Sequence, residues 1–283
     1  MASPHLRYGA GVRPTTKKMY PHSHHQTGEP ILEVQNLSVR YDGRFALEDV
    51  SFHLHAGERV AVVGPNGAGK STLFKVVAGV MPPTSGTVTI SGSRPTTHVC
   101  IGYVPQRAHV DWNFPVSVAD VVMMGRSAIM GAFRWPTHRD WEFVRAALET
   151  VEISDLRTRQ ISELSGGQQQ RMFIARALAQ EAELMLMDEP LTGLDAPSQE
   201  GILNLLDKLQ KQNVTVMVAT HDLDQAEKYF DRVMLLNQKL LGFGESKDVL
   251  KPERLIQAYG NRMRLIDSNG NLIKLDDTCC DEE

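Results

Sequence analysis

A glycine-rich stretch that joins an apolar run to a helical run constrains the fold more than any other part of this 283-residue chain. It reads GPNGAGKST and matches the pattern G-x-x-x-x-G-K-[ST] in full. The run VAVV before it is typical of a buried strand, and the run TLFKVVAGV at its end is typical of a helix. Backbone N–H groups of such a loop can surround phosphate oxygens, the lysine adds a positive charge, and the serine hydroxyl can coordinate Mg²⁺. The stretch therefore predicts a nucleoside triphosphate site made of Gly64, Pro65, Asn66, Gly67, Ala68, Gly69, Lys70, Ser71 and Thr72.

Short apolar runs recur along the chain, with helical stretches between several of them. Runs that are apolar throughout suit strands that are buried on both faces of a parallel sheet. The predicted core strands lie within residues 59–64, 98–106, 183–190, 214–222 and 232–237. Residues 31–41 instead alternate apolar and polar side chains, and residues 46–54 predict a neighbouring strand, so we expect an antiparallel β region near the N-terminus. Residues from about 110 to 182 are helical by pattern and predict an insertion between two core strands.

The overall composition is that of a soluble globular protein, with 42% hydrophobic and 23% charged residues. A formal net charge of -4 lacks the basic excess of a nucleic-acid-binding surface, so we expect no nucleic-acid partner. No apolar run approaches the length of a membrane-spanning helix, and the first residues lack the apolar core of a secretory signal. Three cysteines cannot form a disulfide framework. We expect a cytoplasmic protein.

Both ends of the chain differ from the centre in composition. Residues 1–29 lack hydrophobic periodicity and predict a flexible tail, in which His22, His24 and His25 are either metal ligands or ordinary polar residues. Residues 263–283 form an acidic tail. Its Cys279 and Cys280 are either metal ligands together with the nearby carboxylates or part of a solvated tail.

Polar side chains follow several of the predicted core strands, where ligands of parallel α/β sheets bind. Asp188 and Glu189 follow the buried run LMLM, so we expect Asp188 to hold Mg²⁺ and Glu189 to polarise an attacking water. His221 follows a second strand and could donate to a γ-phosphate. Gln106 follows a third and could reach the metal or the water. Tyr41 either stacks on an adenine ring or packs within the protein.

A second predicted anion site lies about a hundred residues after the first. Residues 164–168 read LSGGQ and open an amphipathic run that predicts a helix. Free N–H groups and the helix dipole favour negative charge at such a helix start. The stretch offers no general base, thiol or metal-ligand cluster, so we expect it to bind a phosphate without taking part in bond cleavage. Its predicted ligands are Ser165, Gly166, Gly167 and Gln168.

Together these motifs resemble those of the ATP-binding subunits of ABC transporters, over about residues 31–260. In that family GPNGAGKST is the Walker A motif, LMLMDE (184–189) the Walker B motif and LSGGQ the signature motif. The resemblance further identifies Gln106 with the Q-loop and Gly193-Leu194-Asp195 with the D-loop. It identifies His221 with the switch histidine and Tyr41 with the A-loop aromatic. It implies an ATPase that uses ATP and Mg²⁺, with Ser71, Gln106 and Asp188 at the metal.

The fold class that the resemblance implies is α/β. We expect a P-loop (RecA-like) core with a mainly parallel sheet, an N-terminal antiparallel β region and a helical ABC subdomain. The ATPase domain would span residues 30–262, with its helical subdomain at about 110–182.

The resemblance also implies partners. The signature motif of one subunit would bind the γ-phosphate held by a second copy, so that two ATP molecules lie within a head-to-tail homodimer. Integral membrane permease subunits would supply the pore, and a solute-binding protein would take part indirectly. The chain would then be peripheral on the inner face of the cell membrane. Trp112, Phe114 and Pro115 either dock the permease or belong to the core of the helical subdomain.

The cargo is predicted from a narrower resemblance. Residues 110–126 resemble the matching region of manganese, zinc and iron importer ATPases, which favours a divalent transition metal, manganese or zinc ahead of iron. Two alternatives stay open. One is another imported solute such as a siderophore or haem, and the other is a non-transport ABC ATPase that acts on ribosomes or DNA.

Overall fold

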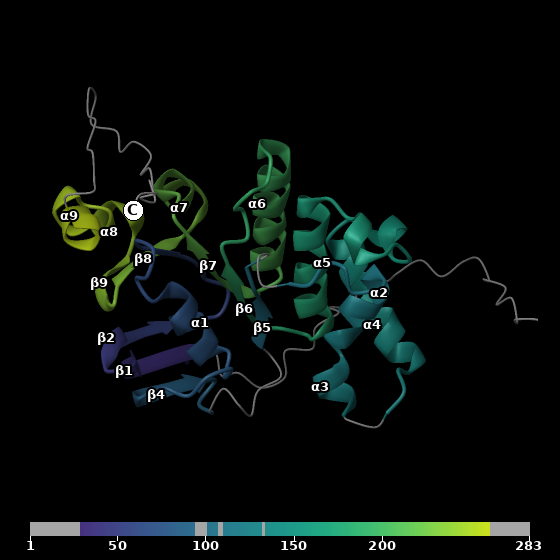
Figure 1. Ribbon diagram of the computed structural model, residues 1–283, viewed down its shortest axis with the longest axis horizontal. Helices are drawn as coiled ribbons and strands as arrows, with labels where there is room; N and C mark the ends of the chain where they lie inside the picture. The colour runs from purple at the N-terminus through teal and green to yellow at the C-terminus, as the bar shows by residue number, and fades with distance from the viewer. Residues whose placement is uncertain (1–28, 94–100, 107–109, 132–133, 261–283) are drawn as a thin grey trace, which may run out of the picture.

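The computed structural model describes residues 29–93, 101–106, 110–131 and 134–260. Within these residues the strands form two sheets, and helices cover both faces of the larger one (Figure 1). The strands are β1 (Leu32–Tyr41), β2 (Arg44–Leu54), β3 (Arg59–Val63), β4 (Ser85–Ile90), β5 (Ile101–Val104), β6 (Leu184–Asp188), β7 (Thr215–Thr220), β8 (Arg232–Asn237) and β9 (Lys239–Gly244). The α-helices are α1 (Lys70–Val77), α2 (Val118–Met124), α3 (Ser127–Met130), α4 (His138–Thr150), α5 (Gly166–Ala179), α6 (Ala196–Lys211), α7 (Leu223–Tyr229), α8 (Ser246–Val249) and α9 (Pro252–Tyr259).

The larger sheet has the strand order β5-β6-β7-β3-β8-β9. All neighbours in it pair in parallel except β8 and β9, which form an antiparallel edge. The apolar runs that predicted core strands are therefore confirmed as β3, β5, β6, β7 and β8. Every residue of β6 and β7 is buried, as expected for strands with layers on both faces.

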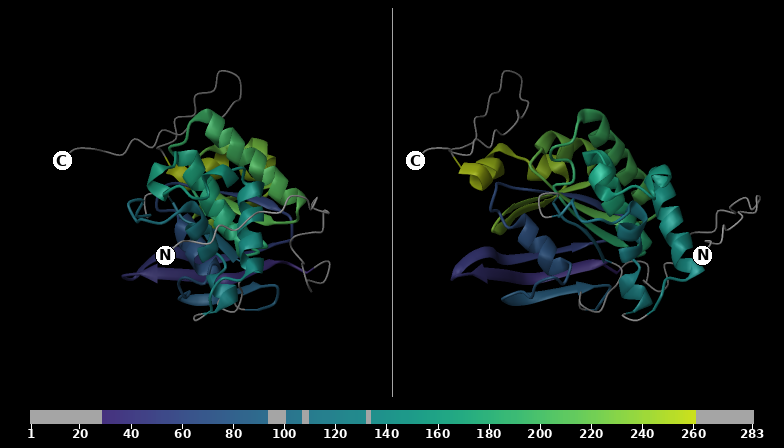
Figure 2. Two further views of the ribbon diagram at one scale, coloured as in Figure 1. Left: turned by 90° about the vertical axis from the view of Figure 1, so that its right-hand side faces the viewer. Right: turned by 45° about the vertical axis from the view of Figure 1, so that its right-hand side comes forward.

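The smaller sheet is antiparallel, with the order β2-β1-β4, and confirms the predicted N-terminal β region. Helix α1 lies between the two sheets (Figures 1 and 2). Its Leu73, Phe74 and Val77 are fully buried in one cluster with apolar side chains of both sheets. This packing holds the start of α1, and hence the glycine-rich loop before it, between the two sheets.

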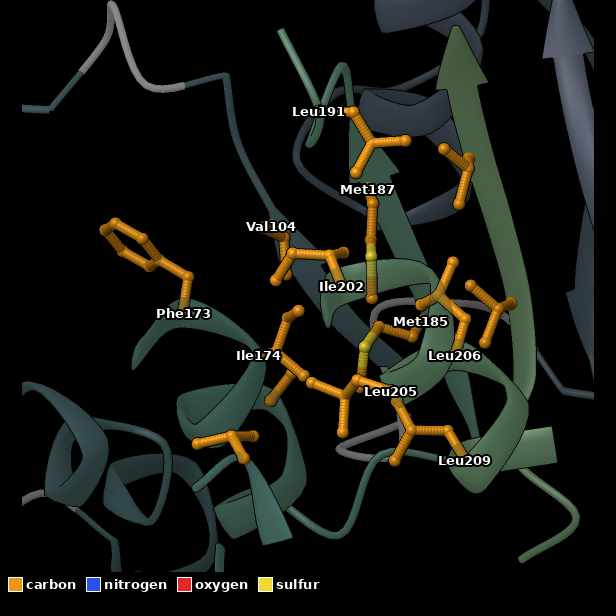
Figure 3. Close-up of a cluster of buried hydrophobic side chains, with 14 of the residues drawn as sticks. Val104, Phe173, Ile174, Met185, Met187, Leu191, Ile202, Leu205, Leu206 and Leu209 are labelled. Carbon is orange, nitrogen blue, oxygen red and sulfur yellow. The ribbon is translucent and has the colours of Figure 1, made fainter. Parts of the chain in front are cut away.

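The predicted helical insertion contains α2, α3, α4 and α5, which lie to one side of the sheets (Figure 1). Three of these helices begin with a capping box, in which a hydroxyl and an acidic or amide side chain satisfy free N–H groups. The hydroxyls belong to Ser117, Thr137 and Ser165. Apolar residues of α5 and α6, among them Ile174 and Leu205, pack with Met185 and Met187 of β6 in one buried cluster (Figure 3).

A buried ionic network inside the helical insertion was not predicted. Arg126 is 3% exposed; it donates to Asp140 at 3.2 Å, to the carbonyl of Ala179 at 2.9 Å and to Glu181 at 2.6 Å. Burial acts to raise the pKa of Asp140, but hydrogen bonds from Thr137 and Arg126 outweigh it and hold that pKa below its usual value. The network joins the end of α2 to α4 and to the end of α5.

Strands β4 and β9 were also not predicted. Strand β4 has the sequence SGTVTI, and its first three residues are exposed. Strand β9 has the sequence KLLGFG and contains no buried residue. Both strands lie at sheet edges, where the burial that marks a core strand is lost. None of the helices in the described part of the chain combines the length and the hydrophobicity that a membrane-spanning helix requires.

Candidate nucleotide site

The glycine-rich loop runs from the end of β3 to the start of α1, as predicted. Two of its glycines are required by close backbone approaches. A Cβ atom at Gly64 would lie 2.0 Å from the carbonyl oxygen of Leu236, and one at Gly69, whose φ is +97°, would lie 2.4 Å from that of Ala46. The backbone N–H of Gln238 also donates to the carbonyl of Ala68 at 2.8 Å. Neighbouring strands therefore hold the loop in shape.

The side chain of Lys70 is buried within this loop, at 6% exposure. Its ammonium donates to the carbonyls of Gly64 at 2.6 Å and Pro65 at 3.2 Å. These bonds hold a positive charge over the loop, where the carbonyls can give way to phosphate oxygens. Ser71 is exposed in the first turn of α1, so its hydroxyl is accessible to a metal ion beside such a phosphate.

Asp188 is the last residue of β6 and is 4% exposed. The hydroxyl of Tyr103 lies 3.5 Å from its Oδ2, in position to donate. Burial and the nearby Asp188 carboxylate raise the pKa of Tyr103 to about 12, so the phenol stays protonated and remains a donor at neutral pH. No motif in the sequence predicts this role of Tyr103, although Tyr103 lies only three residues before Gln106 in the same apolar run.

Glu189 follows directly and has a left-handed backbone, with φ +48°. A non-glycine residue in this conformation is strained, and such strain is concentrated at functional sites. Its Oε2 accepts from Gln106 Nε2 and from Thr192 Oγ1, each at 3.3 Å. The structure thus brings Glu189 together with Gln106, and it adds Thr192, which sequence reasoning missed.

Strand register places these residues at one edge of the sheet. Val63 pairs with Thr220, and Asp188 pairs with Ala219. Glu189 follows β6, His221 follows β7, and the glycine-rich loop follows β3. In the sheet β7 lies between β6 and β3, and neighbouring strands are about 5 Å apart. His221 is exposed there, at the mouth of the site.

Tyr41 lies at the end of β1, in the antiparallel sheet, and is 48% exposed. Its hydroxyl is 3.2 Å from the sulfur of Met81. The half-exposed ring leaves a face that a planar base can contact, so both interpretations of Tyr41 are compatible with its position.

The LSGGQ stretch begins α5, with exposed Ser165 as the N-cap. Ser165 Oγ accepts from the N–H of Gln168, whose side chain accepts from the N–H of Ser165. Gly167 lies against Ser198 of α6, because a Cβ atom there would be 2.8 Å from Ser198 Oγ. Asp195 is the exposed N-cap of α6. The signature residues and Asp195 therefore belong to two helix starts in contact with each other.

In Figure 1, α1 and α5 lie on opposite sides of β6. Helix α5 is thus separate from α1, the helix that follows the glycine-rich loop of the same chain. The first N–H groups of α5, at Gly166 and Gly167, have no acceptor within their own helix and are therefore able to bind an anion.

The aromatic residues of the 110–126 stretch divide between the two predicted roles. Trp112 is half-buried and packs edge-to-face on Phe173 of α5, with ring centroids 5.7 Å apart. Phe114 is 56% exposed, and Pro115 is also exposed. Trp112 therefore belongs to the helical core, whereas Phe114 and Pro115 are available at the surface.

The donor set at this sheet edge fits Mg²⁺ bound with a nucleotide. Mg²⁺ in such sites takes one or two protein ligands and completes its shell with phosphates and water. A buried carboxylate at Asp188, the exposed Ser71 hydroxyl and the Gln106 amide supply hard oxygen ligands. Among the described residues, no group of three or more His, Cys, Asp or Glu side chains could hold a metal ion without a nucleotide. His22, His24, His25, Cys279 and Cys280 lie outside the described residues.

Comparison with known proteins identifies this arrangement. The family model described as ABC transporter matches residues 47–192. The chain is 44% identical to the manganese transport system ATP-binding protein MntB of Bacillus subtilis, over 83% of this chain and 94% of the relative. The chain belongs to the ABC transporter family. It is also 43% identical to the zinc transport system ATP-binding protein TroB of Treponema pallidum, over 82% of this chain and 88% of the relative.

Solved structures of ABC proteins have the same fold. One is of a metal-chelate type ABC transporter in an inward-facing conformation; it is 35% identical, with a TM-score of 0.73, and the match covers 82% of this chain and 89% of that chain. Another is the dimeric ATP-binding cassette MJ0796 bound to ADP and Pi; it is 27% identical, with a TM-score of 0.66, and the match covers 76% and 98%. The chain is thus an ATP-hydrolysing ABC subunit with the predicted α/β fold.

Lys70→Ala in this ABC ATPase is expected to abolish ATP hydrolysis and to raise the Kd for ATP roughly tenfold or more, because each hydrogen bond to a charged phosphate contributes about 1.5–3 kcal/mol. Turnover of purified protein and titration with a fluorescent ATP analogue measure the two effects. Lys75→Ala is the matched control, because Lys75 is exposed on the same helix. Wild-type turnover of Lys70→Ala would contradict the assignment of the loop.

Proposed function

We propose that this ABC ATPase binds ATP and Mg²⁺ at the sheet edge formed by the ends of β3, β6 and β7. The carrying observation is the strand register, which aligns the glycine-rich loop, Asp188–Glu189 and His221. Residues 64–72 surround the phosphates with backbone N–H groups, and Lys70 neutralises their charge. Tyr41 stacks on the adenine. Mg²⁺, held by Ser71, Gln106 and Asp188, would supply charge neutralisation at the phosphates.

Glu189 is the general base of hydrolysis in this proposal. Its Oε2 accepts hydrogen bonds from Gln106 and Thr192, which fix the carboxylate and leave its second oxygen to accept a proton from water. His221, at the exposed mouth of the site, donates to the γ-phosphate oxygens as charge builds up on them. The half-buried Tyr103 lies with its hydroxyl 3.5 Å from Oδ2 of Asp188 and orients that carboxylate.

The second anion site completes the nucleotide site of another copy. Ser165, Gly166, Gly167 and Gln168 begin α5 and offer N–H groups and a hydroxyl, yet α5 lies across β6 from the chain's own loop (Figure 1). A head-to-tail homodimer brings this helix start to the γ-phosphate of the partner, with Asp195 at the contact. The related cassette MJ0796 is dimeric. ATP then holds two copies together, and hydrolysis releases them.

Glu189→Gln is expected to bind ATP, to hydrolyse it roughly 100-fold more slowly or worse, and to accumulate as an ATP-bound dimer. Glutamine keeps the shape and hydrogen bonds of the side chain but cannot accept the proton. Light scattering after size-exclusion chromatography with and without ATP and Mg²⁺ measures the mass. Glu200→Gln, at an exposed position of α6, is the control and should remain monomeric while it turns over ATP. A Glu189→Gln protein that stays monomeric with ATP bound would refute the ATP-bridged dimer.

The ATPase cycle drives a separate membrane protein in this proposal. The surface that carries exposed Phe114 and Pro115 faces the permease. Gln106, whose amide donates to Glu189, lies a few residues before them in the chain. Movement of a permease loop on this surface can therefore reach the catalytic carboxylate through Gln106. The chain lies on the inner face of the cell membrane, bound through its permease, and a solute-binding protein delivers cargo on the other side.

The proposed cargo is a divalent transition metal, manganese or zinc ahead of iron. Support comes from the relatives named for manganese and zinc transport, which are 44% and 43% identical over more than four fifths of this chain. A metal chelate such as a siderophore or haem is the second candidate, because the metal-chelate type transporter is 35% identical. Cargo does not contact this subunit, so transport itself must decide between them.

Deletion of the gene is expected to abolish high-affinity accumulation of manganese or zinc by the cell. The wild-type chain should restore uptake and Glu189→Gln should not, since uptake requires hydrolysis. Radiolabelled manganese, zinc and iron, and one ferric siderophore, measured in parallel, identify the cargo. Unchanged uptake of all three metals together with lost siderophore uptake would contradict the metal proposal and leave the ATPase intact.

A further inference from the structure

Two glutamines join the 191–195 loop, which ends in the D-loop, to helix α7. Gln199 lies in the first turn of α6, and its Nε2 donates to the backbone carbonyls of Leu191 at 3.2 Å and Leu194 at 3.1 Å. Gln225 lies in α7, and its Nε2 donates to Oε1 of Gln199 at 3.1 Å. One side-chain amide therefore holds both ends of a turn in the loop.

The orientation of both amides follows from their partners. Backbone carbonyls can only accept, so Gln199 must turn its NH₂ group to the loop and its Oε1 to α7. Gln225 must then offer its own NH₂ group, which leaves its buried Oε1 without a hydrogen-bond partner among the described residues. An unpaired buried oxygen is unfavourable. The carbonyls of Leu191 and Leu194 in the loop are therefore hydrogen-bonded, whereas Oε1 of Gln225 receives no hydrogen bond from the residues that the structure describes.

Gln225 is fixed in turn to the end of β7. Its backbone N–H donates to Oδ1 of Asp222 at 2.9 Å, and the N–H of Asp222 donates to Oγ1 of Thr220 at 3.1 Å. His221 lies between Thr220 and Asp222 in the sequence. A continuous chain of hydrogen bonds therefore runs from the segment that carries His221, through both glutamines, to the 191–195 loop.

The loop is bonded at its other side to the catalytic carboxylate. Thr192 donates through its hydroxyl to Oε2 of Glu189 and through its N–H to the carbonyl of Glu189, both at 3.3 Å. Between α6 and α7, a groove of about 460 Å³ is lined by both glutamines, so apolar packing does not fill the space at this point. The hydrogen bond between the two glutamines is thus a direct link between the two helices.

We propose that Gln199 is a positioning residue for ATP hydrolysis and that Gln225 sets its orientation. Gln199 holds the 191–195 loop in the shape that places Thr192 on Glu189, and the pair transmits the position of the His221 segment to that loop. The inference rests on the proposed roles of Glu189 and His221, but the effect on the loop itself does not depend on a dimer.

Gln199→Met tests this directly, because methionine has similar length and helix propensity but donates no hydrogen bond. Amide hydrogen exchange of the ATP-free chain should become at least tenfold faster at Thr192 and Leu194, whose N–H groups close the turn. The kcat for ATP should fall at least tenfold while KM changes less than twofold, because the lost contact acts on catalysis rather than on nucleotide binding.

The matched control is Gln212→Met, at the exposed C-cap of the same helix, which should leave exchange and kcat unchanged. Both variants should unfold at temperatures within a few degrees of the wild type. Unchanged exchange at Thr192 and Leu194 in Gln199→Met would overturn the proposal. Because exchange is measured without ATP, this result is independent of whether Glu189→Gln forms the ATP-bridged dimer.

The role of Gln225 is tested by comparing the kcat values of single and double variants. If Gln225 acts through Gln199, then Gln225→Met should lower kcat by less than Gln199→Met, and the double variant should match Gln199→Met alone. Effects on kcat that multiply in the double variant would mean that the two side chains act separately, and would overturn the assigned role of Gln225.

Discussion

The alignment of strand ends at one edge of the parallel sheet is the constraint on which the rest of the structure depends. Pairing of Val63 with Thr220 and of Asp188 with Ala219 brings three short segments to the same place, although they are far apart in the sequence. Each segment leaves its strand by a different route: a glycine-rich loop, a strained residue at Glu189 and a helix cap after His221. Buried layers on both faces of the sheet keep the strands in this register.

The second half of the proposed site lies at helix starts rather than at strand ends. The contact of Gly167 with Ser198 joins the start of α5 to the start of α6, so the signature residues and Asp195 form one surface. Hydrogen bonds of Thr192 and Gln199 connect that surface to Glu189, the proposed general base of the same chain. In the proposed head-to-tail dimer, the surface that contacts the partner's phosphate is therefore connected by hydrogen bonds to Glu189 of its own chain.

The sequence predicted the core strands because buried parallel strands are continuous apolar runs. It predicted the glycine-rich loop between β3 and α1 because that loop has a specific motif. It did not predict β4 or β9, whose residues are largely exposed at sheet edges. Nor did it predict the contacts of Tyr103 and Thr192, which depend on strand pairing and on the left-handed backbone of Glu189. Such contacts are properties of the folded chain and have no local pattern.

The central claim is that the signature residues of one chain complete the nucleotide site of another. It is tested most directly by mixing two inactive variants, Lys70→Ala and Ser165→Arg, and measuring ATP hydrolysis. In a head-to-tail dimer, the mixed pair contains one site with an intact Lys70 from one chain and an intact Ser165 from the other, so hydrolysis should recover well above that of either variant alone. If each chain used its own signature residues, both sites in the mixed pair would be damaged. No recovery, with mixed dimers shown to form, would contradict the account.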